Sequence, residues 1–191
     1  MSTRSKICTS YQDSTSKPIQ KSISATYDII QHMKTLLIKL GGSIITDKST
    51  PGSFRLQNVQ DIAAILAEYR LSNPDTQIIL VHGAGSFAHP FAKQYQLDGQ
   101  WREDTAWGLS RTEQAVRKLN VMITEVMQEF QVPLFGISAS SMAGFQNEVS
   151  FEVNVDLIKS CLDKKLIPTL YGDVALGTEE SYRVICKGST V

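Results

Sequence analysis

The chain has little that would direct it to a membrane, to nucleic acid or to an oxidising compartment. Its 19 basic and 19 acidic side chains cancel over 191 residues, so bulk charge attracts neither nucleic acid nor an anionic membrane. No apolar run is long enough to span a bilayer, and the first residues lack the apolar core of a signal peptide. The three cysteines, Cys8, Cys161 and Cys186, are scattered without metal-ligand spacing. Free thiols in a reducing, cytoplasmic setting are therefore expected.

Residues 1–32 differ from the rest of the chain. They are rich in Ser, Thr, Lys and Gln and carry little periodic apolar content, which favours a disordered tail. The same stretch could be upstream sequence before a true start at Met33. The apolar pattern begins at Lys34, and residues 33–191 are expected to form one domain.

Short apolar runs alternate with helical patterns after Lys34. Strands are predicted at residues 35–40, 77–81, 133–137, 166–171 and 182–185. Helices are predicted from a capping pair at Asn58 and Asp61 to Asn73, then at residues 90–95, 111–130 and 154–162, the last capped by Asn154. This alternation predicts an α/β fold with a largely parallel central sheet.

Polar loops follow four of these strands, at residues 41–48, 82–89, 138–144 and 172–173. Ligands of parallel sheets bind at the carboxyl ends of the strands. The four loops are therefore expected to share one edge of the sheet, where they could form a single site.

The first loop follows a strand that contains a lysine, Lys39, and opens with Gly41 and Gly42 before a second lysine, Lys48. Glycine lets backbone N–H groups approach phosphate oxygens, and two lysines suit a multiply charged phosphate. Lys39 could instead be an edge-strand lysine whose head reaches water. The loop lacks the Gly-Lys-Ser/Thr ending of a P-loop.

The second loop carries Gly83 and Gly85 between a strand and a helix, with His89 beside them. Amides at a helix start can hold an anion, and an imidazole can donate to a phosphate, although a lone histidine is more often packed or on the surface. Asp173 follows a strand and a glycine, so it is either a turn residue or an acceptor that orients lysines or a metal. The serine loop at 138–144 could bind a ligand or be only a loop.

Four motifs together resemble the amino acid kinase superfamily, and within it the isopentenyl phosphate kinases. They are Leu37-Ile-Lys-Leu-Gly-Gly-Ser-Ile-Ile-Thr-Asp-Lys48, Val81-His-Gly-Ala-Gly-Ser-Phe-Ala-His-Pro90, Ala115-Val-Arg-Lys-Leu-Asn120 and Pro168-Thr-Leu-Tyr-Gly-Asp-Val174. The resemblance spans about residues 34–184. It implies a three-layer αβα sandwich and makes residues 33–191 the phosphate- and acceptor-binding portion of that domain.

The resemblance also implies a reaction and a set of roles. ATP, accompanied by Mg²⁺, would phosphorylate isopentenyl phosphate to isopentenyl diphosphate in a cytoplasmic homodimer, and no residue is assigned as a metal ligand. Lys39, Lys48 and Asp173 would be catalytic, with Lys48 stabilising the transferring phosphoryl group and Asp173 organising the two lysines. The residues implied for ATP are Lys39, Leu40, Gly41, Gly42, Ser43 and Gly85. Those implied for the acceptor phosphate are Gly83, Ala84, His89 and Gly172.

The chain departs from the family pattern in two respects. Ala84 and Ala88 stand where the family has glycine, and family members continue well beyond Val191, so the domain is expected to be incomplete at its C-terminal side. Missing elements would leave an apolar edge and face exposed. Two alternatives stay open: another kinase of the superfamily, acting on a phosphonate, a nucleotide or an amino acid, or a truncated, non-catalytic phosphate-binding protein.

Overall fold

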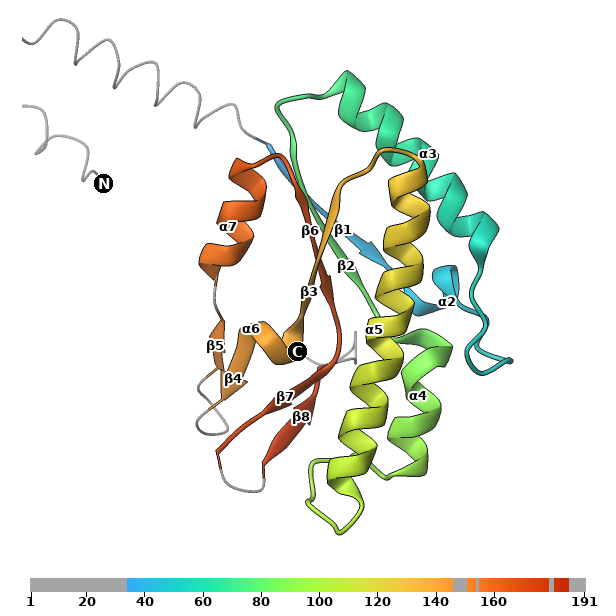
Figure 1. Cartoon of the computed structure of the whole chain (residues 1–191), viewed down its shortest axis with the longest axis vertical. Coiled ribbons are helices and arrows are strands. Elements are labelled where there is room, and N and C mark those ends of the chain that lie inside the picture. The colour runs from blue at the N-terminus through green and yellow to red at the C-terminus, as the bar shows by residue number, and fades with distance from the viewer. Residues whose placement is uncertain (1–33, 146–150, 154, 179–180, 186–191) are drawn as a thin grey trace, which may run out of the picture. The chain divides into compact units, whose positions relative to one another are not determined.

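A four-stranded parallel sheet forms the centre of the molecule (Figure 1). The computed structural model describes residues 34–145, 151–153, 155–178 and 181–185. The strands follow the order β1 (Thr35–Leu40), β2 (Gln77–His82), β6 (Ile167–Tyr171) and β3 (Leu134–Ser138), and every neighbouring pair is parallel. The predicted α/β class and the parallel sheet are therefore confirmed.

Three helices, α3 (Leu56–Ser72), α4 (Gly85–Gln94) and α5 (Thr105–Glu129), lie on one side of this sheet, and α7 (Val155–Asp163) lies on the other (Figure 1). The long helix α5 forms because its apolar residues recur at helical spacing and make one continuous buried stripe. That stripe contains Val116, Leu119, Ile123, Val126 and Met127. None of the described helices is long and apolar enough to cross a bilayer.

Strand β1 has one covered face and one open face. Leu36 and Ile38 pack against the core, whereas the alternate residues Leu37 and Lys39 are exposed, Leu37 to 66%. Phe135 on β3 is also 42% exposed. Within the described part of the chain, no element covers the face of β1 that carries Leu37.

Two predicted elements differ from those observed. The serine loop expected at 138–144 contains a short helix, α6 (Ala139–Met142), followed by β4 (Ala143–Phe145), which pairs with β5 (Phe151–Val153). The last predicted strand is β8 (Tyr182–Val184), and it forms an antiparallel hairpin with β7 (Val174–Leu176) outside the central sheet. Close antiparallel partners, which short apolar runs do not reveal, explain the strands β4 and β8.

The predicted helix starts were partly wrong. Helix α3 begins at Leu56 without a side-chain cap, because the amide of Asn58 donates to the Ile44 carbonyl (2.8 Å) and Asp61 accepts from Gln57. Helix α4 already begins at Gly85, and α5 begins at Thr105 rather than at residue 111. The predicted end of α3 at Asn73 is confirmed. The expected cap Asn154, Cys8, Cys186 and the tail at 1–32 lie outside the described residues.

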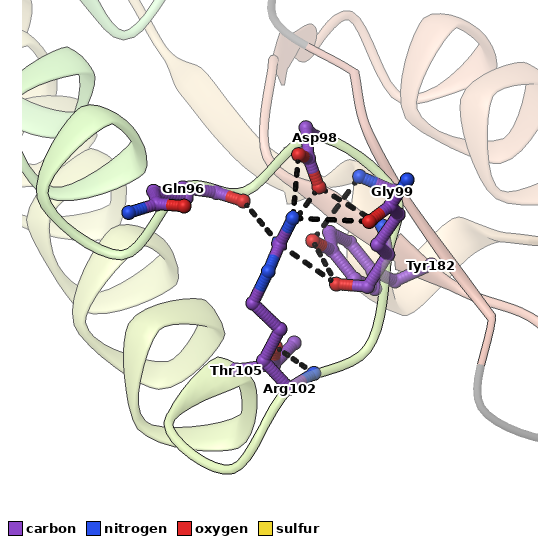
Figure 2. Close-up of polar contacts among 7 residues, drawn as sticks. Gln96, Asp98, Gly99, Arg102, Thr105 and Tyr182 are labelled. Carbon is purple, nitrogen blue, oxygen red and sulfur yellow. Dashed lines mark hydrogen bonds and ion pairs between the residues drawn. The ribbon is translucent and has the colours of Figure 1, made fainter.

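A polar cluster joins the connection before α5 to the β7–β8 hairpin (Figure 2). Arg102 makes a two-pronged ion pair with Asp98 (2.8 and 2.9 Å) and donates to the Gln96 carbonyl. The hydroxyl of Tyr182 accepts from the N–H of Gly99 (3.1 Å) and donates to a neighbouring carbonyl. The hairpin and the start of α5 are thereby held together across more than 80 residues of sequence.

Candidate active site

The four central strands end in one row. Leu40 is paired with His82, His82 with Tyr171, and Tyr171 with Ser138. The loops that follow are also bonded to neighbouring strand ends, since the N–H of Gly83 donates to the Leu40 carbonyl (3.4 Å) and that of Gly172 to the His82 carbonyl (3.1 Å). The loops expected to share one edge of the sheet therefore do begin from the same row.

The first loop makes a single helical turn, α2 (Gly42–Ile45), directly after β1. Gly42 lies against Gly85 of the second loop, because a Cβ placed on Gly42 would be only 2.9 Å from the Gly85 Cα. Real Cβ atoms essentially never come that close. Both glycines are therefore required for this backbone contact, and Gly85 also has a positive φ of 51°.

Thr46 connects these two loops, and the sequence patterns assigned it no role. Its hydroxyl donates to the Gly42 carbonyl (2.7 Å) and accepts from the N–H of Ser86 (3.0 Å). Thr46 is completely buried. It lies inside the motif that ends at Lys48, but its partner Ser86 is 40 residues away, so only the folded structure shows the pairing.

Lys48 lies in a turn that is bonded to the second loop. The carboxylate of Asp47 accepts from the N–H (2.9 Å) and hydroxyl (2.7 Å) of Ser49, which holds the pKa of Asp47 below its usual value. Farther along the turn, the N–H of Gly52 donates to the Ser86 carbonyl (3.0 Å). The side chain of Lys48 is exposed.

His82 is buried beneath the second loop. Its ring stacks on Tyr171, with centroids 5.4 Å apart, and its two nitrogens lie 3.0 Å from the Gly83 carbonyl and 3.2 Å from Asn120 Oδ1. Burial lowers the pKa of His82, an effect only partly offset by these two hydrogen bonds. The imidazole is thus a packed support for the loop.

Asp173 is only 1% exposed. One carboxylate oxygen accepts from the Ser140 hydroxyl (2.8 Å), and the other has no hydrogen-bond partner within the described chain. Burial outweighs that hydrogen bond and raises the pKa of Asp173. No ion pair joins Asp173 to Lys39 or Lys48 within the residues the structure describes. Its predicted role in organising the lysines therefore stays a prediction.

The pocket beside Asp173 brings together residues from two of the loops and from α4, α5 and β8. It is lined by Ala84, Ala88, His89, Ala92, Thr112, Val116, Gly172, Asp173 and Val184. Its free volume is about 10 Å³, which is room for roughly one water molecule. A phosphate group would therefore have to sit at its mouth. Ala84 and Ala88 both line this wall.

A larger apolar pocket of about 320 Å³ lies next to the Ser140–Asp173 pair. Leu109 from α5 and Val174 and Leu176 from the hairpin line it, together with Trp101, which packs edge-on against Tyr182. The structure therefore gives Trp101 a place in the wall of this pocket.

The predicted site residues fall at three strand ends. Lys39, Leu40, Gly41, Gly42 and Ser43 lie at the end of β1; Gly83, Ala84, Gly85 and His89 follow β2; Gly172 and Asp173 follow β6. Lys39 is exposed on β1, an edge strand of the described sheet. This position is compatible with Lys39 as a phosphate-binding residue and with Lys39 as an edge-strand lysine that reaches water. The individual roles of the predicted site residues therefore remain predictions.

Comparison with known proteins gives consistent results. Residues 34–190 match the model of the Amino acid kinase family. The isopentenyl phosphate kinase of Methanocaldococcus jannaschii is 34% identical over 159 residues, covering 78% of this chain and 59% of that protein. The isopentenyl phosphate kinase of Methanothermobacter thermautotrophicus is 29% identical, covering 75% and 55%.

Solved structures agree with these matches. An isopentenyl phosphate kinase structure superposes with a TM-score of 0.70 and 29% identity, covering 79% of this chain and 64% of that one. Aspartate kinase from Synechocystis, at 13% identity and a TM-score of 0.53, shares the fold alone. The chain spans about 59% of the length of the M. jannaschii relative. This chain belongs to the amino acid kinase family.

Proposed function

We propose that this chain provides the phosphate-transferring end of an isopentenyl phosphate kinase type of active site. The reaction is transfer of the γ-phosphoryl group of ATP to isopentenyl phosphate, giving isopentenyl diphosphate and ADP. The observation that carries the proposal is the backbone contact between Gly42 and Gly85 at the carboxyl edge of the sheet. It places two glycine loops, each suited to an anion, directly side by side.

The first loop is the donor side. Phosphoryl transfer needs mainly positioning and charge stabilisation, which backbone amides and lysines supply. The amides of Gly42 and Ser43 begin a helical turn, where N–H groups have no earlier carbonyl in the turn to bond. With Lys39 at the end of β1, these groups would hold the ATP phosphates, and Gly85 would border them from the second loop.

The second loop and the end of β6 are the acceptor side. His89, Gly83, Ala84 and Gly172 would hold the acceptor phosphate at the mouth of the small pocket. The adjacent 320 Å³ apolar pocket offers room for a short hydrocarbon tail. A phosphate monoester is already a nucleophile at neutral pH, so no general base is needed.

Lys48 would neutralise negative charge on the γ-phosphoryl group during its transfer. Within the described residues there is no cluster of three or more His, Cys, Asp or Glu side chains that could hold a metal. Mg²⁺ would therefore be bound mainly through the ATP phosphates, as this ion commonly is. By resemblance the enzyme would be a homodimer in the cytoplasm. Light scattering after size-exclusion chromatography tests the homodimer.

A coupled ADP-release assay on the full chain tests the proposal. Turnover with isopentenyl phosphate should exceed that with a phosphonate, a nucleoside monophosphate or an amino acid. His89→Ala should weaken use of the acceptor, and Lys159→Ala, on an exposed lysine of α7, should match the parent chain. Preference for another acceptor would indicate a different kinase of the family.

A calorimetric titration completes this test. Binding of isopentenyl phosphate without any turnover would indicate a non-catalytic phosphate-binding protein. Equal turnover of the parent chain and His89→Ala would contradict the role of His89.

A further inference from the structure

Ser86 is bonded three times to the segment that carries Lys48. Its N–H donates to Thr46 Oγ1 (3.0 Å), its carbonyl accepts from the N–H of Gly52 (3.0 Å), and its hydroxyl donates to the Ser53 carbonyl (3.4 Å). Both Thr46 and Ser86 are buried. The turn between residues 46 and 53 is therefore attached to the second loop at both of its ends.

The Thr46 hydroxyl is the part of this connection that reaches both glycine loops. It donates to the Gly42 carbonyl and accepts from the Ser86 amide, so one oxygen atom lies between the two loops. The Thr46 hydroxyl is packed closely against Gly85, because a Cβ on Gly85 would lie 2.3 Å from that oxygen. A buried amide that lost this acceptor would be left unsatisfied, which is costly.

We infer that Thr46 is a positioning residue for phosphoryl transfer, whose hydroxyl sets the separation of the donor loop, the acceptor loop and the Lys48 turn. The kinetic part of this inference rests on the proposed function. Each loop keeps its own amides without the hydroxyl, so each substrate can still bind alone. In-line transfer needs both phosphates aligned at once, and small misplacements lower the rate of that step steeply.

Thr46→Val tests the inference, because valine keeps the shape and removes the hydroxyl. Its kcat should fall by about tenfold or more, while KM for ATP and for isopentenyl phosphate each change by less than about threefold. Thr46→Ser restores a hydroxyl and should stay within about threefold of the parent kcat. Thr50→Val makes the same chemical change on an exposed threonine of the same turn and should behave like the parent chain.

Amide hydrogen exchange of Ser86, followed by NMR, tests the connection without any turnover. The Ser86 amide should exchange slowly in the parent chain, in Thr46→Ser and in Thr50→Val, and faster by about tenfold or more in Thr46→Val. Unchanged exchange in a folded Thr46→Val would overturn the connection itself. Fast exchange with a normal kcat would overturn the positioning role.

The two proposals fail in different ways. If the parent chain turns over none of the acceptors, the proposed function fails, and the exchange rates alone decide whether Thr46 joins the loops. If the parent chain is active, a tenfold loss that Thr46→Ser does not recover would point to general loss of packing and would count against the hydroxyl.

Discussion

The Cα of Gly85 lies 2.9 Å from the point that a Cβ on Gly42 would occupy, so the two loop glycines meet backbone against backbone. At this point their contact leaves no room for a side chain, and the buried hydroxyl of Thr46 bridges the two loops beside it. The glycine contact and the Thr46 hydroxyl together hold the two loops at a fixed separation, which a phosphoryl transfer site can use as a rigid frame.

Gly42→Ala should separate the two loops and lower the free energy of unfolding by about 1–3 kcal/mol, the usual range for an added methyl in a full site. Gly41→Ala is the matched control, because its Cβ would meet only Ile44, at an ordinary 3.9 Å. Urea unfolding of both variants measures the difference. Equal stabilities would mean that the loops can move apart at little cost.

Asp173→Asn should stabilise the fold at neutral pH. The raised pKa means that the folded chain favours the protonated carboxyl, so ionisation destabilises the fold as pH rises above the ordinary value of 3.8. Removing the charge should raise the free energy of unfolding at pH 7, and the gain should shrink as pH falls toward 3.8. Urea titrations at several pH values measure it.

Asp47→Asn provides a control of opposite sign. The pKa of Asp47 is lowered by its hydrogen bonds to Ser49, so its ionised form favours the fold. This variant should not gain stability at pH 7. A gain of similar size in both variants would show that burial of Asp173 is not the cause.

His82 should titrate below the ordinary histidine value of 6.5, because its imidazole is buried. The unfolded chain then takes up more protons than the folded one below that pH, so this residue makes stability fall as pH drops beneath about 6.5. The chain has three histidines, so their ring signals can be followed individually by NMR. Asn120→Asp should raise the His82 pKa, because it places a carboxylate beside the ring. A measured pKa of His82 at the ordinary value of 6.5 would contradict the predicted effect of burial.

The uncovered face of β1 should make the chain associate with itself. Leu37→Lys should reduce both the binding of a hydrophobic dye and the sedimentation of larger species, because it adds a charge to an open apolar strand. Leu71→Lys is the control: Leu71 is 85% exposed at the end of α3, away from the sheet. A parent chain that stays monomeric and binds no dye would show that this face is protected.

Much of the sheet could be predicted because its signals are local. A short apolar run followed by glycine indicates a strand end, and this pattern located the ends of β1, β2 and β6 to within one residue. Glycines and a histidine at such ends drew attention to the correct loops for the same reason.

The features that were missed depend on contacts between distant residues. Thr46 is an ordinary polar residue in sequence, and its function as a connection appears only when Ser86 comes beside it. Helix α5 starts before its predicted start because Thr105 accepts from the N–H of Arg102 (2.8 Å) and that arginine is held by Asp98. Residue types alone made this region look like a charged loop.

The common row of strand ends has a consequence for how the protein acquires its site. The row joins residues from Leu40 to Tyr171, and the neighbours β2 and β6 are separated in sequence by every element from α4 to α7. Closing such long loops is slow, and it is rewarded only when the whole sheet is assembled. No fragment that ends before Tyr171 contains the complete row, so a nascent or proteolysed chain should lack the complete site until β6 has joined the sheet.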